Sequence, residues 1–506
     1  SDQSPKIHES GNLLSTIEIK RGDCIKAEKQ SEYVTKGTYK TQRIEHAFME
    51  LECCVAKPHR DEIEVFSQGQ GVYEDRNSIS KILGIPLEKV KVSLMPNGGA
   101  FGGKEDISVQ GHASLFAHFL QLPVRVALTR PESLLMHPKR HPMSMEISMG
   151  CDNNGKLTFV KADIIGDTGA YASVGMKVLE RAAGHATSVY MIPSVDILSR
   201  AVYTNNVPCG AMRGFGVNQI NFAVESCLDE LCELGGFDRW QIRYDNALKP
   251  GDCTSTGQKI TSGIGIQKTL LAVKDKFQNA RYAGIACGMK NTGIGNGVAD
   301  EGKVKVVIES PTNITIHHGW TEMGQGVFTM AVQFLCEATG ISPEMISVKV
   351  DTSKEAPAGM TTASRGTSII GNSVLDAGSK IKADLETHSL AELVGREYEG
   401  EWICDWTTSI ESETENPQTH YSYSYATQVV TLDDSGQIET VYAAHDAGRI
   451  INPVLFEGQL EGSVHMGLGY ALSENFEMQE GRPRHTKLGK LGMIRAASTP
   501  KIVVIG

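Results

Sequence analysis

Two glycine-rich segments of the chain each hold side chains that could do chemistry. Residues 97–105 (Asn-Gly-Gly-Ala-Phe-Gly-Gly-Lys-Glu) contain Phe101 and Glu105, and residues 205–216 contain Arg213 and Phe215. Glycine tolerates positive φ and leaves no Cβ between the backbone and a ligand. An arginine can place its planar fork against an anion or a carbonyl, and an aromatic ring can stack on a flat ligand. Both segments are candidate binding loops, although each alone is also compatible with an ordinary turn.

The elements around the first loop are a strand and a helix. An alternating apolar stretch at residues 90–95 precedes the loop, and a helical run at residues 110–120 follows it. This order leaves free N–H groups at a helix N-terminus, where an anionic or acceptor-rich ligand can bind. A dinucleotide fingerprint is excluded, because Ala100 stands where G-x-G-x-x-G read from Gly98 requires its second glycine.

The same cassette occurs twice along the chain. Residues 69–73 (Gly-Gln-Gly-Val-Tyr) match residues 324–328 (Gly-Gln-Gly-Val-Phe), and both copies lead through a strand to a small-residue loop, 97–105 and 358–366. Hairpin signals at residues 152–155 and 433–436 follow in the same order. We therefore predict two homologous α+β halves, with a ligand held where their glutamine and glycine loops converge.

The predicted boundaries follow from this repeat. Residues 1–60 are a lead segment and the start of the first half, residues 61–250 are the first half, residues 251–281 are a connection, and residues 282–506 are the second half. The acidic stretch 386–415 is predicted to be peripheral.

Composition narrows the class of protein. The 506 residues carry a formal net charge of -11, which argues against nucleic acid as a partner. No apolar run reaches the length of a membrane span and no targeting segment is evident, so we expect a cytoplasmic protein without a membrane partner. The 11 cysteines are scattered without the spacing of an iron–sulfur or zinc site.

Five motifs carry a family resemblance: residues 98–105, 180–181, 212–215 with Gln219, 319–326 and 361–366. In this order and at these separations, they resemble the molybdenum-binding part of the xanthine dehydrogenase/aldehyde oxidase family, from about residue 30 to the end of the chain. The resemblance implies a molybdopterin-type cofactor bound between the two halves. Its pterin dithiolene holds molybdenum with oxo and sulfido or selenido ligands, and the protein binds it through backbone and amide groups.

The resemblance also assigns residues to the cofactor. Those that line the molybdenum centre, without a direct side-chain ligand, are Gln70, Phe101, Arg213 and Ala363. Those implied to contact the rest of the cofactor are Gly102, Gln325 and Ser364.

For the substrate, Glu105 and Arg181 resemble the carboxylate and guanidinium that hold a purine, and Phe215 resembles an aromatic that packs on the ring. The resemblance implies hydroxylation of a purine or related N-heterocycle at an electron-poor carbon, with oxygen from water. Arg181 would stabilise negative charge on the heterocycle and Glu105 would relay a proton. Asn296 stands about where a second aromatic is expected, which leaves the ring stack one-sided.

Further components are expected outside this chain. The family's glutamate base does not occur in residues 500–506 and is expected on a segment beyond them or on another polypeptide. Iron–sulfur (2Fe-2S) and flavin (FAD) groups are expected on partner subunits of a hetero-oligomer. Two alternatives remain open: a member of the same family that oxidises aldehydes or other aromatics, and a cofactor-binding scaffold subunit without turnover.

Overall fold

The computed structural model describes residues 4–506, which form two compact units. Unit 1 contains residues 4–45, 138–297 and 407–506, and unit 2 contains residues 46–137 and 298–406. Each unit therefore takes segments from both halves of the sequence.

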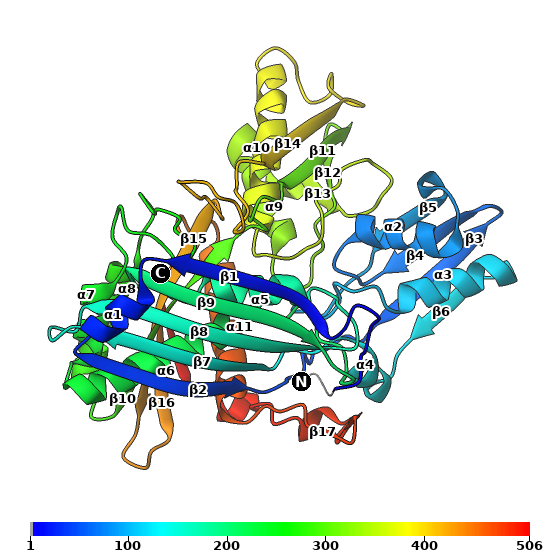
Figure 1. Ribbon diagram of the computed structural model, residues 1–506. Helices are drawn as coiled ribbons and strands as arrows, with labels where there is room; N and C mark the ends of the chain where they lie inside the picture. The colour runs from blue at the N-terminus through cyan, green and yellow to red at the C-terminus, as the bar shows by residue number, and fades with distance from the viewer. Residues whose placement is uncertain (1–3) are drawn as a thin grey trace. The chain divides into compact units, whose positions relative to one another are not determined.

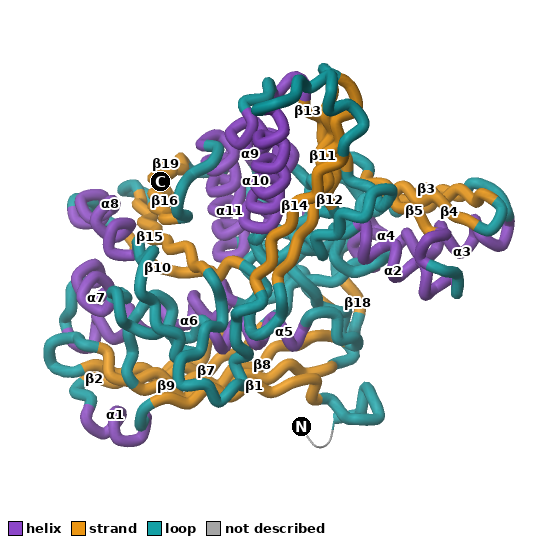
Figure 2. Tube along the Cα trace, turned by 90° about the horizontal axis from the view of Figure 1, so that it is seen from above, coloured by secondary structure: helices purple, strands orange, loops and turns teal. Residues whose placement is uncertain are grey.

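A five-stranded sheet in the order β1-β9-β8-β7-β2 forms the first layer of unit 1 (Figure 1). Its strands are β1 (Leu13–Arg21), β2 (Tyr33–Thr41), β7 (Met143–Cys151), β8 (Leu157–Gly169) and β9 (Ser194–Tyr203). Helices α5 (Gly175–Gly184) and α6 (Val217–Gly235) lie on one face, and α1 (Cys24–Gln30) lies on the other (Figure 2). The predicted hairpin is present: Asp152 caps the β7–β8 turn by accepting hydrogen bonds from the N–H groups of Asn154 and Lys156.

A second sheet of unit 1 repeats this pattern in the order β10-β15-β16-β19. Its strands are β10 (Ala283–Thr292), β15 (Ser422–Leu432), β16 (Ile438–Asp446) and β19 (Lys501–Ile505). Two antiparallel pairs followed by a parallel pair reproduce the arrangement of β2, β7, β8 and β9. The prediction of two homologous α+β halves is confirmed.

Other elements complete unit 1. They are α7 (Arg239–Asn246), α8 (Ile266–Gln278), α11 (Pro453–Leu472), the short strands β17 (Met478–Gln479) and β18 (Arg482–Pro483), and the single turns η3 (Leu488–Lys490) and η4 (Ala496–Ser498). Helix α8 lies in residues 251–281, the predicted connection, and buries Ile266, Leu270 and Val273 in the main core. The lead segment likewise contributes β1 and β2 to the first sheet.

Unit 2 holds two copies of one smaller α+β motif. The first copy has the sheet β5-β4-β3-β6, and the second has β13-β12-β11-β14. The elements of the first copy are β3 (Cys53–His59), β4 (Glu62–Ser67), α2 (Val72–Leu83), η1 (Leu87–Lys89), β5 (Val90–Leu94), α3 (Val109–Leu120), β6 (Val124–Ala127) and α4 (Arg130–Met136). Those of the second are β11 (Asp300–Ser310), β12 (Asn313–His318), α9 (Val327–Thr339), η2 (Pro343–Met345), β13 (Ile346–Lys349), α10 (Gly366–Leu385) and β14 (Glu397–Cys404).

The first helix of each copy begins and ends at the same kinds of residue. Helices α2 and α9 both begin after a Gly-Gln-Gly turn and both end at a left-handed glycine, Gly84 at φ 66° and Gly340 at φ 76°. A bridge between Ser93 and Asp351 joins the copies inside unit 2.

Residues 386–415, which were predicted to be peripheral, include β14 at the edge of the second sheet of unit 2. This strand pairs with β11 and buries alternate residues, among them Tyr398 and Gly400, against the sheet and α10. Its many glutamates mark only the solvent face of the strand, so composition concealed an alternating pattern. Among residues 4–506, no helix combines the length and the apolar character that a membrane crossing requires.

Candidate functional site

Gln70 is the centre of a hydrogen-bonded junction in unit 2. Its side chain is 2% exposed, and its Oε1 accepts from the N–H groups of Gly102 (3.0 Å) and Lys104 (3.2 Å). Its Nε2 donates to the carbonyl of Thr361 (2.9 Å), and the Gln70 carbonyl accepts from the Thr361 N–H (2.8 Å). One glutamine thus ties together the Gly-Gln-Gly turn, the 97–105 loop and the 358–366 loop, which come from both halves of the sequence.

The loops at this junction hold non-glycine residues in the left-handed region. Phe101 has φ 57°, Ala363 has φ 59° and Ser364 has φ 50°. Such conformations cost about 1–3 kcal/mol each and persist where the surroundings enforce them, often at functional sites. Phe101 is also 38% exposed. The backbone of each loop is therefore held in a left-handed conformation at a residue that is not glycine.

Gln325, the counterpart of Gln70 in the second copy, bonds differently. Its Nε2 donates to the Thr321 carbonyl (2.7 Å) and its Oε1 accepts from the Met323 N–H (2.7 Å), so it braces only its own turn. The Glu322 carboxylate accepts from the N–H groups of Gly324, Gly326 and Phe328 at the start of α9. The turn still reaches the first copy, because the Gly99 N–H donates to the Met323 carbonyl (3.2 Å).

Glu105 lies at the end of the first glycine loop, next to the 358–366 loop. The pKa of its carboxyl group is raised to about 8, chiefly by loss of hydration and to a smaller extent by the nearby Asp106, while the Thr362 hydroxyl and Arg365 oppose the rise. Glu105 can therefore hold a proton near neutral pH, which the predicted relay role requires.

Arg365, which the sequence analysis did not single out, fixes the 358–366 loop. It is 3% exposed, pairs with Asp300 at 2.5 Å and donates to the Met360 carbonyl at 3.0 Å. Its guanidinium also lies over the Trp320 ring, 5.1 Å from the centroid. Its position inside the small-residue loop 358–366 is the feature of the sequence that could have identified it.

Unit 1 contains the other predicted residues. Arg213 donates to the carbonyl (2.8 Å) and the side-chain oxygen (3.2 Å) of Gln459 on α11. No carboxylate pairs with it among residues 4–506, and burial lowers the pKa of its guanidinium. A half-buried arginine without a carboxylate partner is suited to an anionic or carbonyl-rich ligand.

Phe215 occupies a strained turn that lies against α5. It has φ 52° between Gly214 at φ 101° and Gly216 at φ 89°. A Cβ on Gly216 would lie 2.2 Å from the carbonyl oxygen of Val178, so only glycine allows this approach. The turn therefore places Phe215 beside the helix that carries Glu180 and Arg181.

Arg181 is buried and held by its neighbours. It is 5% exposed, its Nη1 lies 3.1 Å from Glu180 Oε1, and its Nη2 donates to the Ile294 carbonyl. Asn296, at φ 52°, also donates to Glu180 Oε1. The position where an aromatic was expected thus carries an amide that joins the Glu180–Arg181 pair.

Three further side chains near Arg181 escaped the sequence analysis: His185, Lys290 and His420. His185 follows Arg181 by one helical turn, and its Nδ1 lies 2.9 Å from the Arg181 carbonyl. That i, i+4 spacing was visible in the sequence, whereas Lys290 and His420 come from distant segments that only the fold brings to α5.

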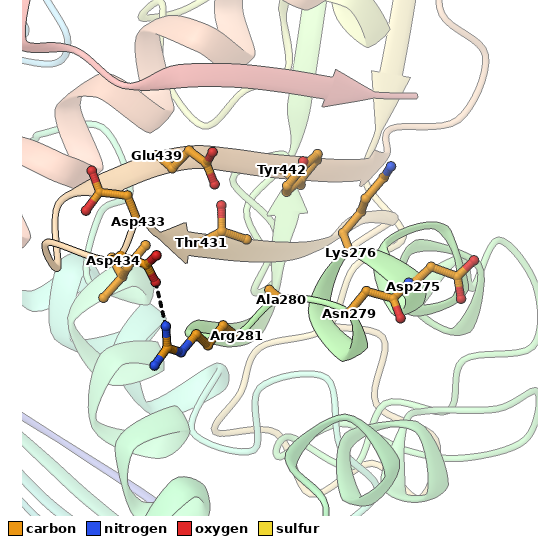
Figure 3. A pocket seen from close by; sticks show the side chains of 11 residues that line it. Asp275, Lys276, Asn279, Ala280, Arg281, Thr431, Asp433, Asp434, Glu439 and Tyr442 are labelled. Atoms are coloured by element: carbon orange, nitrogen blue, oxygen red, sulfur yellow. Dashed lines mark hydrogen bonds and ion pairs between the residues drawn. The ribbon is translucent and has the colours of Figure 1, made fainter.

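A separate surface hollow lies between the end of α8 and the β15–β16 hairpin (Figure 3). Its lining includes Asp275, Lys276 and Glu439, and Arg281 pairs with Asp434 across its edge at 2.8 Å. None of the predicted site residues lines it, and its charged groups are those of a solvated surface.

The fold and these loops define the class of protein. Models of the molybdopterin cofactor-binding domain match residues 7–247 and residues 265–500. The chain therefore belongs to the xanthine dehydrogenase/aldehyde oxidase family of molybdenum hydroxylases, as its motifs predicted.

Proteins of known name are similar to this chain over much of its length. The chain is 32% identical to a probable xanthine dehydrogenase subunit of Bacillus subtilis, covering 94% of this chain and 70% of that protein. It is 36% identical to the nicotinate dehydrogenase large molybdopterin subunit of Eubacterium barkeri, covering 54% of this chain and 65% of that protein.

Solved structures share the fold. The aldehyde oxidoreductase from Desulfovibrio gigas superposes with a TM-score of 0.91 at 24% identity, covering all of this chain and 59% of that one. The chain thus spans between half and three quarters of the length of these proteins.

Proposed function

We propose that the chain is the molybdenum-binding catalytic subunit of an enzyme that hydroxylates a purine or related N-heterocycle at carbon with oxygen from water. The observation that carries the proposal is the Gln70 junction, where loops from both halves of the sequence meet through one buried amide. A junction of this kind holds loop backbones in fixed positions, as a large cofactor bound by backbone and amide groups requires.

The residues present fit such a cofactor. In unit 2, the turns of Phe101 and Ala363–Ser364 and the Gln70 amide would hold it, with contacts from Gly102 and Gln325. In unit 1, the half-buried Arg213 would contact it. When bound, the cofactor supplies the two-electron oxidation chemistry, and no protein side chain is needed as a metal ligand.

The chain's own residues would bind and orient the substrate. With a pKa of about 8, Glu105 is mostly protonated at neutral pH and can donate a hydrogen bond to a ring nitrogen or carbonyl. Arg181, braced by Glu180, would stabilise negative charge that develops on the ring, and Phe215 would pack on its face. These polar groups favour a hydrogen-bonding heterocycle over a simple aldehyde.

Partners and location are part of the proposal. Electrons would leave through iron–sulfur and flavin subunits of a hetero-oligomeric complex, and the complex would act in the cytoplasm, in purine catabolism or a related degradation. The names of the relatives support a multi-subunit enzyme.

Dye-linked oxidation by the purified native complex tests this function. Hypoxanthine, xanthine, nicotinate and benzaldehyde would be compared in ¹⁸O-labelled water, and we expect label in the product of at least one heterocycle. Faster oxidation of the aldehyde would support the aldehyde-oxidising alternative. A molybdenum-loaded complex that turns over none of the four would favour the scaffold alternative.

A further inference from the structure

A group of basic side chains surrounds the C-terminal end of α5 in unit 1. We call it the α5 cation cluster and define it by Lys177, Arg181, His185, Lys290 and His420. Its members come from α5 and the residue after it, from β10, and from the segment before β15.

The cluster gathers more cations than carboxylates. Glu180 is the carboxylate that contacts it, and both of its oxygens are engaged: Oε1 by Arg181 and Asn296, and Oε2 by Lys177 at 2.9 Å. Lys290 donates to the Asn291 amide oxygen at 2.5 Å and has no carboxylate partner within residues 4–506. Lys290 is half-buried, and a partly dehydrated lysine without a carboxylate is stabilised in its charged form by a nearby anion.

The imidazole rings of His185 and His420 add buried polar atoms to the α5 cation cluster. His185 and His420 are 2% and 3% exposed, and their ring centroids lie 6.1 Å apart. Nδ1 of His185 faces the Arg181 carbonyl and Nδ1 of His420 lies 3.3 Å from the Tyr423 hydroxyl, while Nε2 of each ring has no hydrogen-bond partner among residues 4–506. Asn296 Oδ1 is also buried, and the described part of the chain offers it no hydrogen-bond partner. Buried polar atoms are nearly always paired, so these atoms indicate a ligand or water between them.

Neighbouring groups set the protonation of the cluster. Burial, and then Arg181, lower the pKa of Lys290 to about 7. Burial, and then Lys290, lower the pKa of His185 to about 3, and burial with Arg181 and His185 lowers the pKa of His420. Tyr423 stays neutral because burial raises the pKa of its hydroxyl to about 12. An anion placed here would favour protonated Lys290 and would bind together with a proton.

We propose that the α5 cation cluster binds the carboxylate of an aromatic N-heterocyclic acid, with the ring lying toward the Phe215 turn. The inference rests on the proposed function and narrows its substrate to a ring that carries an anionic group. Asn296 fits this reading, since an amide beside Glu180 and Arg181 pairs with polar groups where an aromatic would only stack.

The test measures binding without turnover, using benzoate and its neutral analogue benzamide as probes. Isothermal titration of the native complex at about pH 6.5 and pH 8 gives affinity, and buffers of different ionisation enthalpy give proton uptake. We expect benzoate to bind at least tenfold more tightly than benzamide, and its affinity to fall above about pH 7 as Lys290 loses its proton.

Two substitutions of Lys290 distinguish the effect of its charge on benzoate binding from the effect of its size. We expect Lys290→Met to reduce benzoate affinity at least tenfold, Lys290→Arg to retain most of it, and Lys268→Met, an exposed lysine on α8, to leave it unchanged. The wild-type comparison of benzoate with benzamide needs no variant, so a misfolded Lys290→Met protein would not block the test.

Three results would overturn the proposal: equal binding of benzoate and benzamide, benzoate affinity indifferent to Lys290, or Lys290-dependent binding of inorganic phosphate but not of benzoate. The last would assign the cluster to a phosphate group. Failure of the proposed function gives a different result, namely no heterocycle oxidation by the complex whatever benzoate does.

Discussion

Replacement of Gln70 by leucine should destabilise unit 2 far more than its size suggests. The substitution removes an acceptor from the N–H groups of Gly102 and Lys104 and a donor from the Thr361 carbonyl. A buried polar group left without a partner costs about 1–3 kcal/mol, so three of them cost about 3 kcal/mol or more. Gln325→Leu is the matched control, since that side chain braces only its own turn and water can replace its bonds. It should cost about 1 kcal/mol.

Urea unfolding followed by tryptophan fluorescence measures the difference, with the buried Trp320 as a probe in unit 2. Both variants and the wild type should come from cells grown without molybdate, because a bound cofactor would add its own stabilisation. Equal losses for the two variants, or a loss below about 1 kcal/mol for Gln70→Leu, would refute the view that Gln70 joins three loops.

Three other perturbations follow from the structure. Gly216→Ala should cost about 1–3 kcal/mol more than Gly436→Ala in urea unfolding, because both glycines have positive φ but only the first meets a backbone carbonyl. Arg243→Met should cost about 3–5 kcal/mol in the same assay, because it leaves the buried Glu225 carboxylate, 2.9 Å from Arg243 Nε, without its cation. The folded-state pKa of Glu105, about 8, lies above its ordinary value, so the stability it contributes at low pH is lost as pH rises toward 8. Thermal melting of Glu105→Gln should therefore match the wild type near pH 5 and exceed it increasingly up to about pH 8; parallel melting curves would contradict the raised pKa.

Local patterns predicted much of the fold. The helical run predicted at residues 110–120, after the first glycine loop, corresponds to α3 (Val109–Leu120). The repeated Gly-Gln-Gly turns and hairpins revealed the internal duplication, because each signal depends only on neighbouring residues. The interleaving of the two units was not accessible, since strand pairing between distant segments leaves no local mark.

The sequence likewise revealed the loops of the candidate site but not the contacts between them. Loops with unusual residues, such as the one around Phe101, stand out in sequence because strained turns restrict residue choice. The bonding of Gln70 to Thr361 and the approach of Lys290 to Arg181 depend on tertiary packing. Gln70 and Gln325 look equivalent in the sequence, yet the structure assigns them different partners.

Molybdenum and pterin content of the freshly isolated native complex tests the central claim most directly. We expect close to one molybdenum and one pterin per chain in the wild type and in Lys268→Met, a change at an exposed lysine on α8, and a large loss of both in Gln70→Leu. A folded wild-type complex without molybdenum or pterin, or a Gln70→Leu complex loaded as fully as the wild type, would contradict it.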